Sequence, residues 1–167
     1  IQIIERDLNT AFTARDAGRQ EAWSTDFDLY RVAIDGSSAP VCLTEENEAW
    51  DCCPLFSPDG KTMAYLAMAR PRYEADRYRI VLQEWPDGDK RVLTEAWDRS
   101  PSSVCWSADG HSLLVTASNL GQKSLFKIDV ATGDVQTLIP DGYVSSPAVA
   151  GDRILFGSNH LSSPTEL

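Results

Sequence analysis

The chain has 167 residues, 43% of them hydrophobic and 24% charged, which is enough for a domain with a buried core. Its formal net charge of -10 repels phosphate backbones and anionic membrane surfaces, so we expect neither a nucleic-acid nor a membrane partner. The acidity either keeps the protein soluble or attracts cationic groups, such as the free amino terminus of a peptide.

The start of the chain has no signal-peptide pattern, because charges interrupt the apolar residues of Ile1–Asp7 at once. We therefore expect the chain to begin inside a larger protein. The first predicted elements are a long loop over Arg15–Asp26, a strand over Asp28–Ile34, a tight turn at Asp35–Gly36 and a strand over Pro40–Thr44.

The next segment predicts four strands, each a short run rich in β-branched or aromatic residues and bounded by Gly, Pro or Asp. A helical pattern is nearly absent from the chain, and Glu45–Trp50 has room for one turn at most. The predicted strands are Pro54–Ser57, Thr62–Met68, Tyr78–Trp85 and Lys90–Thr94, with turns at Pro58–Gly60 and Pro86–Gly88.

The following segment repeats this scheme. Trp106 leads into a turn at Asp109–Gly110, and strands are predicted over Ser112–Ala117, Ser124–Asp129 and Val135–Leu138, the last preceded by a turn at Ala131–Gly133. A fourth segment begins at Pro147 and ends after a strand over Ile154–Phe156.

These segments form an internal repeat of about 50 residues. Phe56–Gly60 recurs as Trp106–Gly110, and Leu43–Glu45 recurs as Leu93–Glu95, each 50 residues later. Trp50-Asp51 recurs as Trp97-Asp98 at 47 residues, and Pro54, Pro101 and Pro147 keep a spacing of 47 and 46. This period fits a four-stranded propeller blade better than a helical repeat.

The predicted fold class is therefore all-β, a partial β-propeller of about three four-stranded antiparallel blades plus part of a fourth. The expected blades cover residues 1–53, 54–100, 101–146 and the start of another over 147–167, with no catalytic domain. Propellers close with about four to eight blades, so we expect open blade edges and a chain that is either marginally stable or oligomeric through these edges.

The connections at the two ends of such a blade differ in length, which predicts different roles for the two ends. The turns after strands one and three lie at one end and are tight, whereas the other end carries the loops Arg15–Asp26, Glu45–Cys53, Ala69–Arg77 and Glu95–Ser100. Long loops on a rigid scaffold often carry function, so this end is the predicted working face. Its charged and aromatic side chains fit a peptide-facing or protein-facing surface, or else rim ion pairs of little energetic weight. These side chains are Arg15, Arg19, Glu21, Trp23, Asp26, Arg70, Arg72, Tyr73, Glu74, Asp76, Arg77, Trp97, Asp98 and Arg99. Trp50 and Trp97 are predicted to serve blade packing.

The sequence carries no pattern of catalytic or metal chemistry. The Gly-x-Ser-x-Gly motif of α/β-hydrolases is absent, and so are phosphate loops and His-rich clusters, so we expect no cofactor and no metal. His111 and His160 are expected at the surface.

The four cysteines are too few for a disulfide framework, and the adjacent Cys52-Cys53 lacks zinc-ligand spacing. We expect buried free thiols, or a bridge from one of this pair to Cys42 or Cys105.

The pattern Pro-x-Phe-Ser-Pro-Asp-Gly-Lys over Pro54–Lys61 resembles the propeller repeats of the prolyl oligopeptidase (S9) family of serine peptidases and of the Tol system's periplasmic propeller protein. Two loop segments, Phe12–Tyr30 and Met68–Arg77, are similar to the dipeptidyl peptidase 5 and acylaminoacyl peptidase branch. The resemblance covers roughly residues 11–160.

This resemblance implies a non-catalytic propeller segment that gates and filters peptide substrates for a C-terminal α/β-hydrolase domain, which carries the whole catalytic triad. Some relatives bind the substrate's amino terminus with propeller carboxylates, and here Glu74 and Asp76 are the candidates. Arg70, Arg72 and Tyr73 of the same loop are the further substrate-binding candidates. The alternative is a Tol-type propeller that acts as a protein-interaction module. The relatives favour a periplasmic or secreted location over the cytoplasm.

Overall fold

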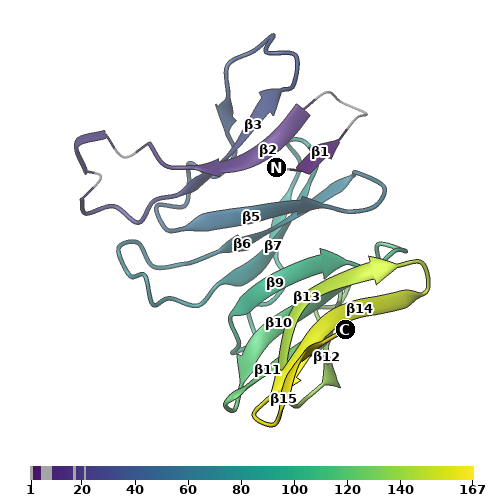
Figure 1. Ribbon diagram of the computed structural model, residues 1–167. Coiled ribbons are helices and arrows are strands. Elements are labelled where there is room, and N and C mark those ends of the chain that lie inside the picture. Colours follow the sequence, from purple (N-terminus) through teal and green to yellow (C-terminus); the bar gives the residue numbers. More distant parts are fainter. Residues whose placement is uncertain (1, 5–8, 17, 21) are drawn as a thin grey trace. The chain divides into compact units, whose positions relative to one another are not determined.

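The computed structural model describes residues 2–4, 9–16, 18–20 and 22–167 (Figure 1). The described chain is all-β, apart from one turn of 3₁₀ helix, η1 (Gly18–Gln20), in the first long loop. It divides into two compact units, Ile1–Val92 and Leu93–Leu167. The all-β prediction is thus confirmed, and each unit is described by itself.

The first unit consists of two antiparallel sheets in which strands follow one another in chain order. One sheet has the order β1-β2-β3-β4, and the other β5-β6-β7-β8 (Figure 1). The bounds are β1 (Gln2–Ile4), β2 (Asn9–Ala14), β3 (Asp28–Ala33), β4 (Val41–Cys42), β5 (Asp51–Phe56), β6 (Thr62–Ala67), β7 (Arg79–Glu84) and β8 (Lys90–Val92). Each sheet is a four-stranded up-and-down blade, as the period predicts.

The second unit continues the scheme. β9, β10, β11 and β12 pair antiparallel in sequence, and β13, β14 and β15 form three strands of a further blade. One parallel bridge, Lys123 to Tyr143, joins the two groups into a seven-stranded sheet. The bounds are β9 (Pro101–Trp106), β10 (Ser112–Asn119), β11 (Gln122–Asp129), β12 (Val135–Ile139), β13 (Tyr143–Ala150), β14 (Arg153–His160) and β15 (Ser163–Glu166).

The Ser-x-Asp-Gly turns explain why the repeat is visible in the sequence. Gly60 has a φ of +71°, and its N–H donates to the Ser57 carbonyl at 2.9 Å. The Asp59 carboxylate accepts from the Ser57 hydroxyl at 2.7 Å and from the Lys61 N–H at 3.1 Å. A side chain at Gly60 would be strained, and a short carboxylate suits this turn. The same three bonds, at 3.0, 2.6 and 3.0 Å, recur 50 residues later among Ser107, Asp109, Gly110 and His111.

The innermost strands carry a β-bulge, which makes them longer than predicted. In β5, Cys53 and Pro54 together face the single residue Tyr65, because the register shifts between Cys52 and Leu55. In β13, Ser146 and Pro147 occupy the same kind of bulge. Cys53 and Ser146 have φ values of +58° and +49°. The predicted strand over Pro54–Ser57 therefore begins three residues early, at Asp51.

The predicted phase of Trp97 and Pro101 is wrong. The backbone N–H groups of Asn47 and Trp97 both donate to the carbonyl of the threonine three residues earlier, so these two residues are equivalent, 50 residues apart. Trp50 instead stacks on Phe27 at 4.4 Å between ring centroids, whereas Trp97 meets a different ring edge-on. Pro101 begins β9 and pairs with Ala117, outside any position equivalent to Pro54.

The hydrophobic core of the first unit is shared by its two sheets. Buried side chains from β2, β3, β5, β6 and β7 pack together, and Trp85 contacts Phe56 edge-on at 4.7 Å. Such burial contributes roughly 1.5–3 kcal/mol for each large apolar side chain. The core therefore fixes the two blades to one another and with them the loops at their ends. Its buried members are Ala11, Leu29, Leu43, Phe56, Met63, Tyr65, Ala67 and Val81.

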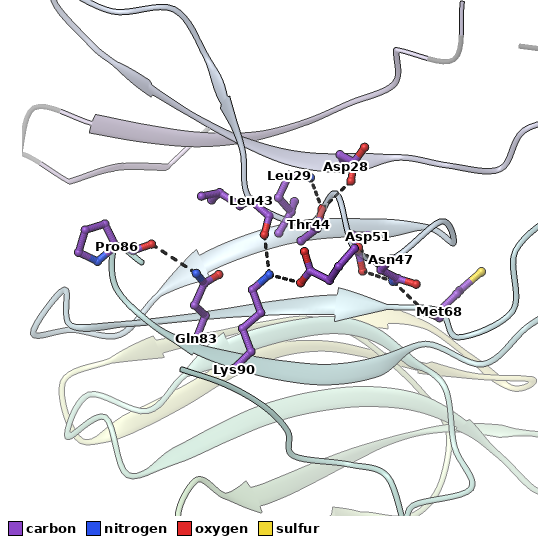
Figure 2. A network of polar contacts seen from close by, with 11 residues as sticks. Asp28, Leu29, Leu43, Thr44, Asn47, Asp51, Met68, Gln83, Pro86 and Lys90 are labelled. Atoms are coloured by element: carbon purple, nitrogen blue, oxygen red, sulfur yellow. Dashed lines mark hydrogen bonds and ion pairs between the residues drawn. The ribbon is translucent and has the colours of Figure 1, made fainter. Parts of the chain in front are cut away.

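A polar network holds the connection from β4 to β5 (Figure 2). The Thr44 hydroxyl, which is buried, donates to the Asp28 carboxylate at 2.9 Å. The Lys90 ammonium group on β8 donates to the Leu43 carbonyl and pairs with the Glu46 carboxylate. The outer strand of the second blade is thereby tied to the segment that leaves the first blade.

Candidate functional site

The candidate site lies at the two long loops of the first unit, the β2–β3 loop (residues 15–27) and the β6–β7 loop (residues 68–78). Both connect the second and third strands of their blades, and so both leave the blades at the predicted working face. The Arg72 N–H donates to the Thr25 hydroxyl at 2.7 Å. Arg72 itself has a φ of +64°, so the chain turns sharply where the two loops meet.

Local contacts give the β2–β3 loop its shape. The Arg15 guanidinium lies over the Phe27 ring at 5.2 Å and donates to the Ser24 carbonyl at 3.2 Å. The Ser24 hydroxyl accepts from the Asp26 N–H at 3.0 Å. Burial and nearby carboxylates raise the pKa of Asp26. These contacts leave Trp23 projecting from the loop, with 77% of its surface exposed.

Asp76 organises the β6–β7 loop. One carboxylate oxygen accepts from the N–H groups of Ala69 and Arg70 at 2.8 and 2.9 Å, and the other pairs with the Arg70 guanidinium at 2.8 Å. Burial by itself would raise the pKa of Asp76, but these donors outweigh it and bring the pKa down to about 2. The Arg70 guanidinium also lies 4.1 Å from the centre of the Tyr73 ring.

Between the loops lies an open groove of about 670 Å³, here named the loop groove. Trp23 and the 47% exposed Tyr73 present aromatic surface to it, and Arg72 and Glu74 present opposite charges. Within the described part of the chain the Glu74 carboxylate has no hydrogen-bond or ion-pair partner. Aromatic faces with a guanidinium and an unpaired carboxylate can hold a short peptide by its ends and side chains. The lining residues are Ala22, Trp23, Ser24, Thr25, Arg72, Tyr73, Glu74 and Ala75.

The five predicted site residues fall into two groups. Arg72, Tyr73 and Glu74 line the loop groove. Arg70 and Asp76 instead bind one another and hold the loop from within, so the Asp76 carboxylate is already saturated. Thr25, which was not a predicted site residue, joins the loops; no sequence signal marks a single threonine for this role. Of the predicted working-face residues, Glu21 lies outside the described residues.

Three further working-face residues lie outside the loop groove: Arg19, Asp98 and Arg99. In the first unit Arg19 is exposed on η1. In the second unit the Arg99 guanidinium binds the side-chain oxygen of Asn119 at 3.1 Å and pairs with Asp98 at 2.6 Å. These two residues therefore shape their own loop, as rim ion pairs do.

A buried carboxylate lies at the start of β5 (Figure 2). Asp51 is fully buried, and the Asn47 side-chain amide donates to both its oxygens at 2.9 and 3.0 Å and to the Met68 carbonyl at 3.1 Å. Burial raises the pKa of Asp51 to about 7 although these hydrogen bonds oppose the rise. Asp51 thus anchors the first residue of the β6–β7 loop through Asn47.

The cysteines are all free thiols. The predicted bridge to Cys42 or Cys105 is absent, and the expectation that all four are buried is wrong, because Cys53 is exposed and the other three are partly buried. Cys52 and Cys53 line a second groove of about 550 Å³, here named the cysteine groove. Its lining residues are Ala11, Phe12, Thr13, Phe27, Trp50, Cys52, Cys53 and Pro54.

The described residues contain no group of three or more His, Cys, Asp or Glu side chains placed to hold a metal ion. In the same part of the chain, no helix has the length and apolar character of a membrane span.

The chain is similar in sequence to part of known dipeptidyl-peptidases. No protein-family model matches the chain. The chain is 34% identical to a probable dipeptidyl-peptidase 5 from Arthroderma benhamiae over 168 residues, and equally to the dipeptidyl-peptidase 5 from Trichophyton schoenleinii. Each match covers 92% of this chain, but the chain spans only 23% of these relatives.

Solved structures show the same fold at low sequence identity. The acylaminoacyl peptidase from Pyrococcus horikoshii matches 95% of this chain with a TM-score of 0.69 and 18% identity, over 23% of its own chain. A puromycin hydrolase matches 93% with a TM-score of 0.70 and 19% identity, over 28% of its own chain. TolB from Acinetobacter baumannii matches 96% with a TM-score of 0.60 and 21% identity, over 41% of its own chain.

Proposed function

Since the chain is a β-propeller segment of the prolyl oligopeptidase (S9) family and is homologous to part of dipeptidyl-peptidase 5, we propose that it filters peptide substrates for a serine exopeptidase of which it is the non-catalytic part. The observation that carries this proposal is the loop groove. The two loops that line it, residues 15–27 and 68–78, overlap the segments Phe12–Tyr30 and Met68–Arg77, whose sequence resembles this peptidase branch.

In this proposal the chain selects peptide substrates by their size and charge and does not itself cleave them. The partner is a C-terminal α/β-hydrolase domain of the same protein, which supplies the nucleophile, base and oxyanion donors. The long loops narrow the approach to that domain, so short peptides pass and folded chains are excluded. Open blade edges are the proposed contact surface for further copies or further blades.

The Glu74 carboxylate is the proposed reader of the substrate's amino terminus. Its lack of a partner in the described chain leaves it available for a charge-assisted hydrogen bond from an ammonium group. Arg72 and Tyr73 are the proposed contacts for the peptide that follows. Asp76 and Arg70 are proposed to position these three by holding the loop.

The test uses the full-length peptidase with Glu74→Gln and, as the matched control, Glu74→Asp. For a dipeptidyl substrate with a free amino terminus, Glu74→Gln is expected to raise KM about tenfold, which corresponds to about 1.4 kcal/mol, and Glu74→Asp to raise it less. For the same substrate with an acetylated amino terminus, KM should not change. An equal change for both substrates, or none for either, contradicts the role of Glu74.

The alternative function is a Tol-type propeller that binds a partner protein through the same loops. The match to TolB over 96% of this chain supports it. The reading frame that encodes these residues separates the two functions. A downstream Gly-x-Ser-x-Gly motif supports the peptidase, and a stop codon after further blades, with no hydrolase domain, supports the interaction module.

A further inference from the structure

A vicinal pair of thiols lies at the bulge of β5, outside the loop groove. Cys52 pairs with Leu66, whereas Cys53 and Pro54 share one partner residue on β6. β5 is also the edge strand of its sheet. The peptide segment that joins the two cysteines is therefore held less tightly by ladder hydrogen bonds than a regular strand.

The same bulge in β13 contains serines. Ser145, Ser146 and Pro147 take the register of Cys52, Cys53 and Pro54, and Ser146 has the same left-handed φ as Cys53. The bulge conformation thus belongs to the blade and does not need sulfur. What is particular to β5 is that two thiols replace two hydroxyls.

These thiols are accessible and have an apolar approach. Cys53 is exposed at the cysteine groove, whose wall includes the stacked rings of Phe27 and Trp50, 4.4 Å apart. Cys52, the preceding residue of β5, is partly buried. One thiol is therefore presented to solvent, and its neighbour in the chain is the partly buried one.

The two thiols differ in pKa. Interaction with the neighbouring Cys52 thiol lowers the pKa of Cys53 to about 7, although burial opposes this, and the same interaction and desolvation raise the pKa of Cys52. Burial also raises the pKa of Cys42 and of Cys105. Because the thiolate is the nucleophile, Cys53 is expected to react first among the four.

We propose that Cys52 and Cys53 form a thiol–disulfide exchange site for low-molecular-mass disulfides such as oxidised glutathione. The Cys53 thiolate attacks one sulfur of the disulfide, whose S–S bond breaks and releases one thiolate. The Cys52 thiol then loses its proton to solvent and attacks the Cys53 sulfur. This step releases the second thiolate and leaves a Cys52–Cys53 disulfide; two protein thiols are oxidised and one external disulfide is reduced.

This bridge is expected to be reversible. Adjacent Cα atoms lie about 3.8 Å apart, which is shorter than the spacing of ordinary disulfides, so the ring is strained and easily reduced. A strained and exposed disulfide belongs to the labile class rather than the structural class. Oxidation then replaces the two thiols that line the cysteine groove by one disulfide. This proposal does not depend on the proposed peptide-filtering function.

The test treats the Cys42→Ser/Cys105→Ser variant with oxidised glutathione at neutral pH and follows its intact mass. We expect the loss of two hydrogen masses, a peptide containing a Cys52–Cys53 bridge, and full reversal by dithiothreitol. In the wild-type chain Cys53 should react at least about tenfold faster than Cys42 or Cys105.

Two serine variants complete the test, and the serines of β13 show that this bulge accommodates them. Cys52→Ser should keep a stable glutathione adduct on Cys53, and Cys52→Ser/Cys53→Ser should fold and not react at this site. A stable adduct without loss of hydrogen in Cys42→Ser/Cys105→Ser, unreacted thiols there, or a wild-type bridge to Cys42 or Cys105 overturns the proposal.

Discussion

The backbone N–H of Arg72 donates to the hydroxyl of Thr25 at 2.7 Å and so joins two loops that lie 47 residues apart in the sequence. Thr25 is buried, whereas the rings of Trp23 and Tyr73 in the same two loops are exposed. This hydrogen bond therefore joins the two loops that line the loop groove, on two blades that share one core.

Thr25→Val keeps the shape of the side chain and removes the acceptor. The hydrogen bond is partly buried, so water can replace the lost acceptor in part, and we expect a loss of about 1 kcal/mol in the free energy of unfolding, measured by urea denaturation. Thr25→Ser is the control and should lose less, because it keeps the hydroxyl. Proteolysis within residues 69–77 should become faster in Thr25→Val alone. Equal stability and equal proteolysis rates in the two variants would contradict the claim that the Thr25 hydroxyl holds the two loops together.

Asp76→Asn tests the organisation of the β6–β7 loop. The pKa of Asp76 is lowered to about 2, so its contribution to stability is present above about pH 4 and is lost as the pH falls towards about 2. We expect Asp76→Asn to lose about 1 kcal/mol at neutral pH, because Arg70 is largely exposed and its ion pair is screened.

The difference between wild type and Asp76→Asn should shrink in acid, which denaturation at about pH 3 and at about pH 7 measures. Glu74→Gln is the matched control, since this neighbouring carboxylate has no partner within the described chain and should leave stability unchanged. If the free energies of unfolding of wild type and Asp76→Asn differ equally at both pH values, the charge of Asp76 does not stabilise the loop.

The features of this fold that could be predicted from the sequence are those that require particular residues. The turns at Gly60 and Gly110 require the same φ of +71° and the same Asp and Ser contacts, so the repeat is preserved in the residues and predicts the blades correctly. The loops have no such requirement. Asn47 and Trp97 take equivalent places with unrelated side chains, and a coincidental Trp-Asp pair therefore misleads the alignment by three residues.

The candidate site was predictable in its location but only partly in its roles. Loop length and composition indicate the segment Arg70–Asp76, yet they do not distinguish a carboxylate that faces solvent from one that binds its own loop. That distinction depends on the turn at Arg72 and on the N–H groups that Asp76 meets. The bulge that exposes Cys53 was missed because register shifts arise from pairing with β6.

Asp51→Asn tests the buried carboxylate at the start of β5. Because the pKa of Asp51 is raised to about 7, the folded state holds a proton that the unfolded state releases, and stability falls as the pH rises from about 4 to about 7. The full effect is at most about 4 kcal/mol, and Asp51→Asn should remove this slope. Asp98→Asn is the control, since Asp98 is 80% exposed and should keep the wild-type slope. A wild-type slope in Asp51→Asn would contradict the raised pKa.

If the long loops filter peptides for the catalytic domain, shortening one of them should admit longer peptides. In the full-length peptidase, residues 69–77 are replaced by the Leu-Gly turn that joins β10 to β11 in the second unit. The measurement is kcat/KM for a long peptide divided by kcat/KM for a dipeptidyl amide. We expect this ratio to rise at least about tenfold, which corresponds to a difference of about 1.4 kcal/mol in activation free energy between the two substrates. A folded variant with full activity on the dipeptidyl amide and an unchanged ratio would contradict it.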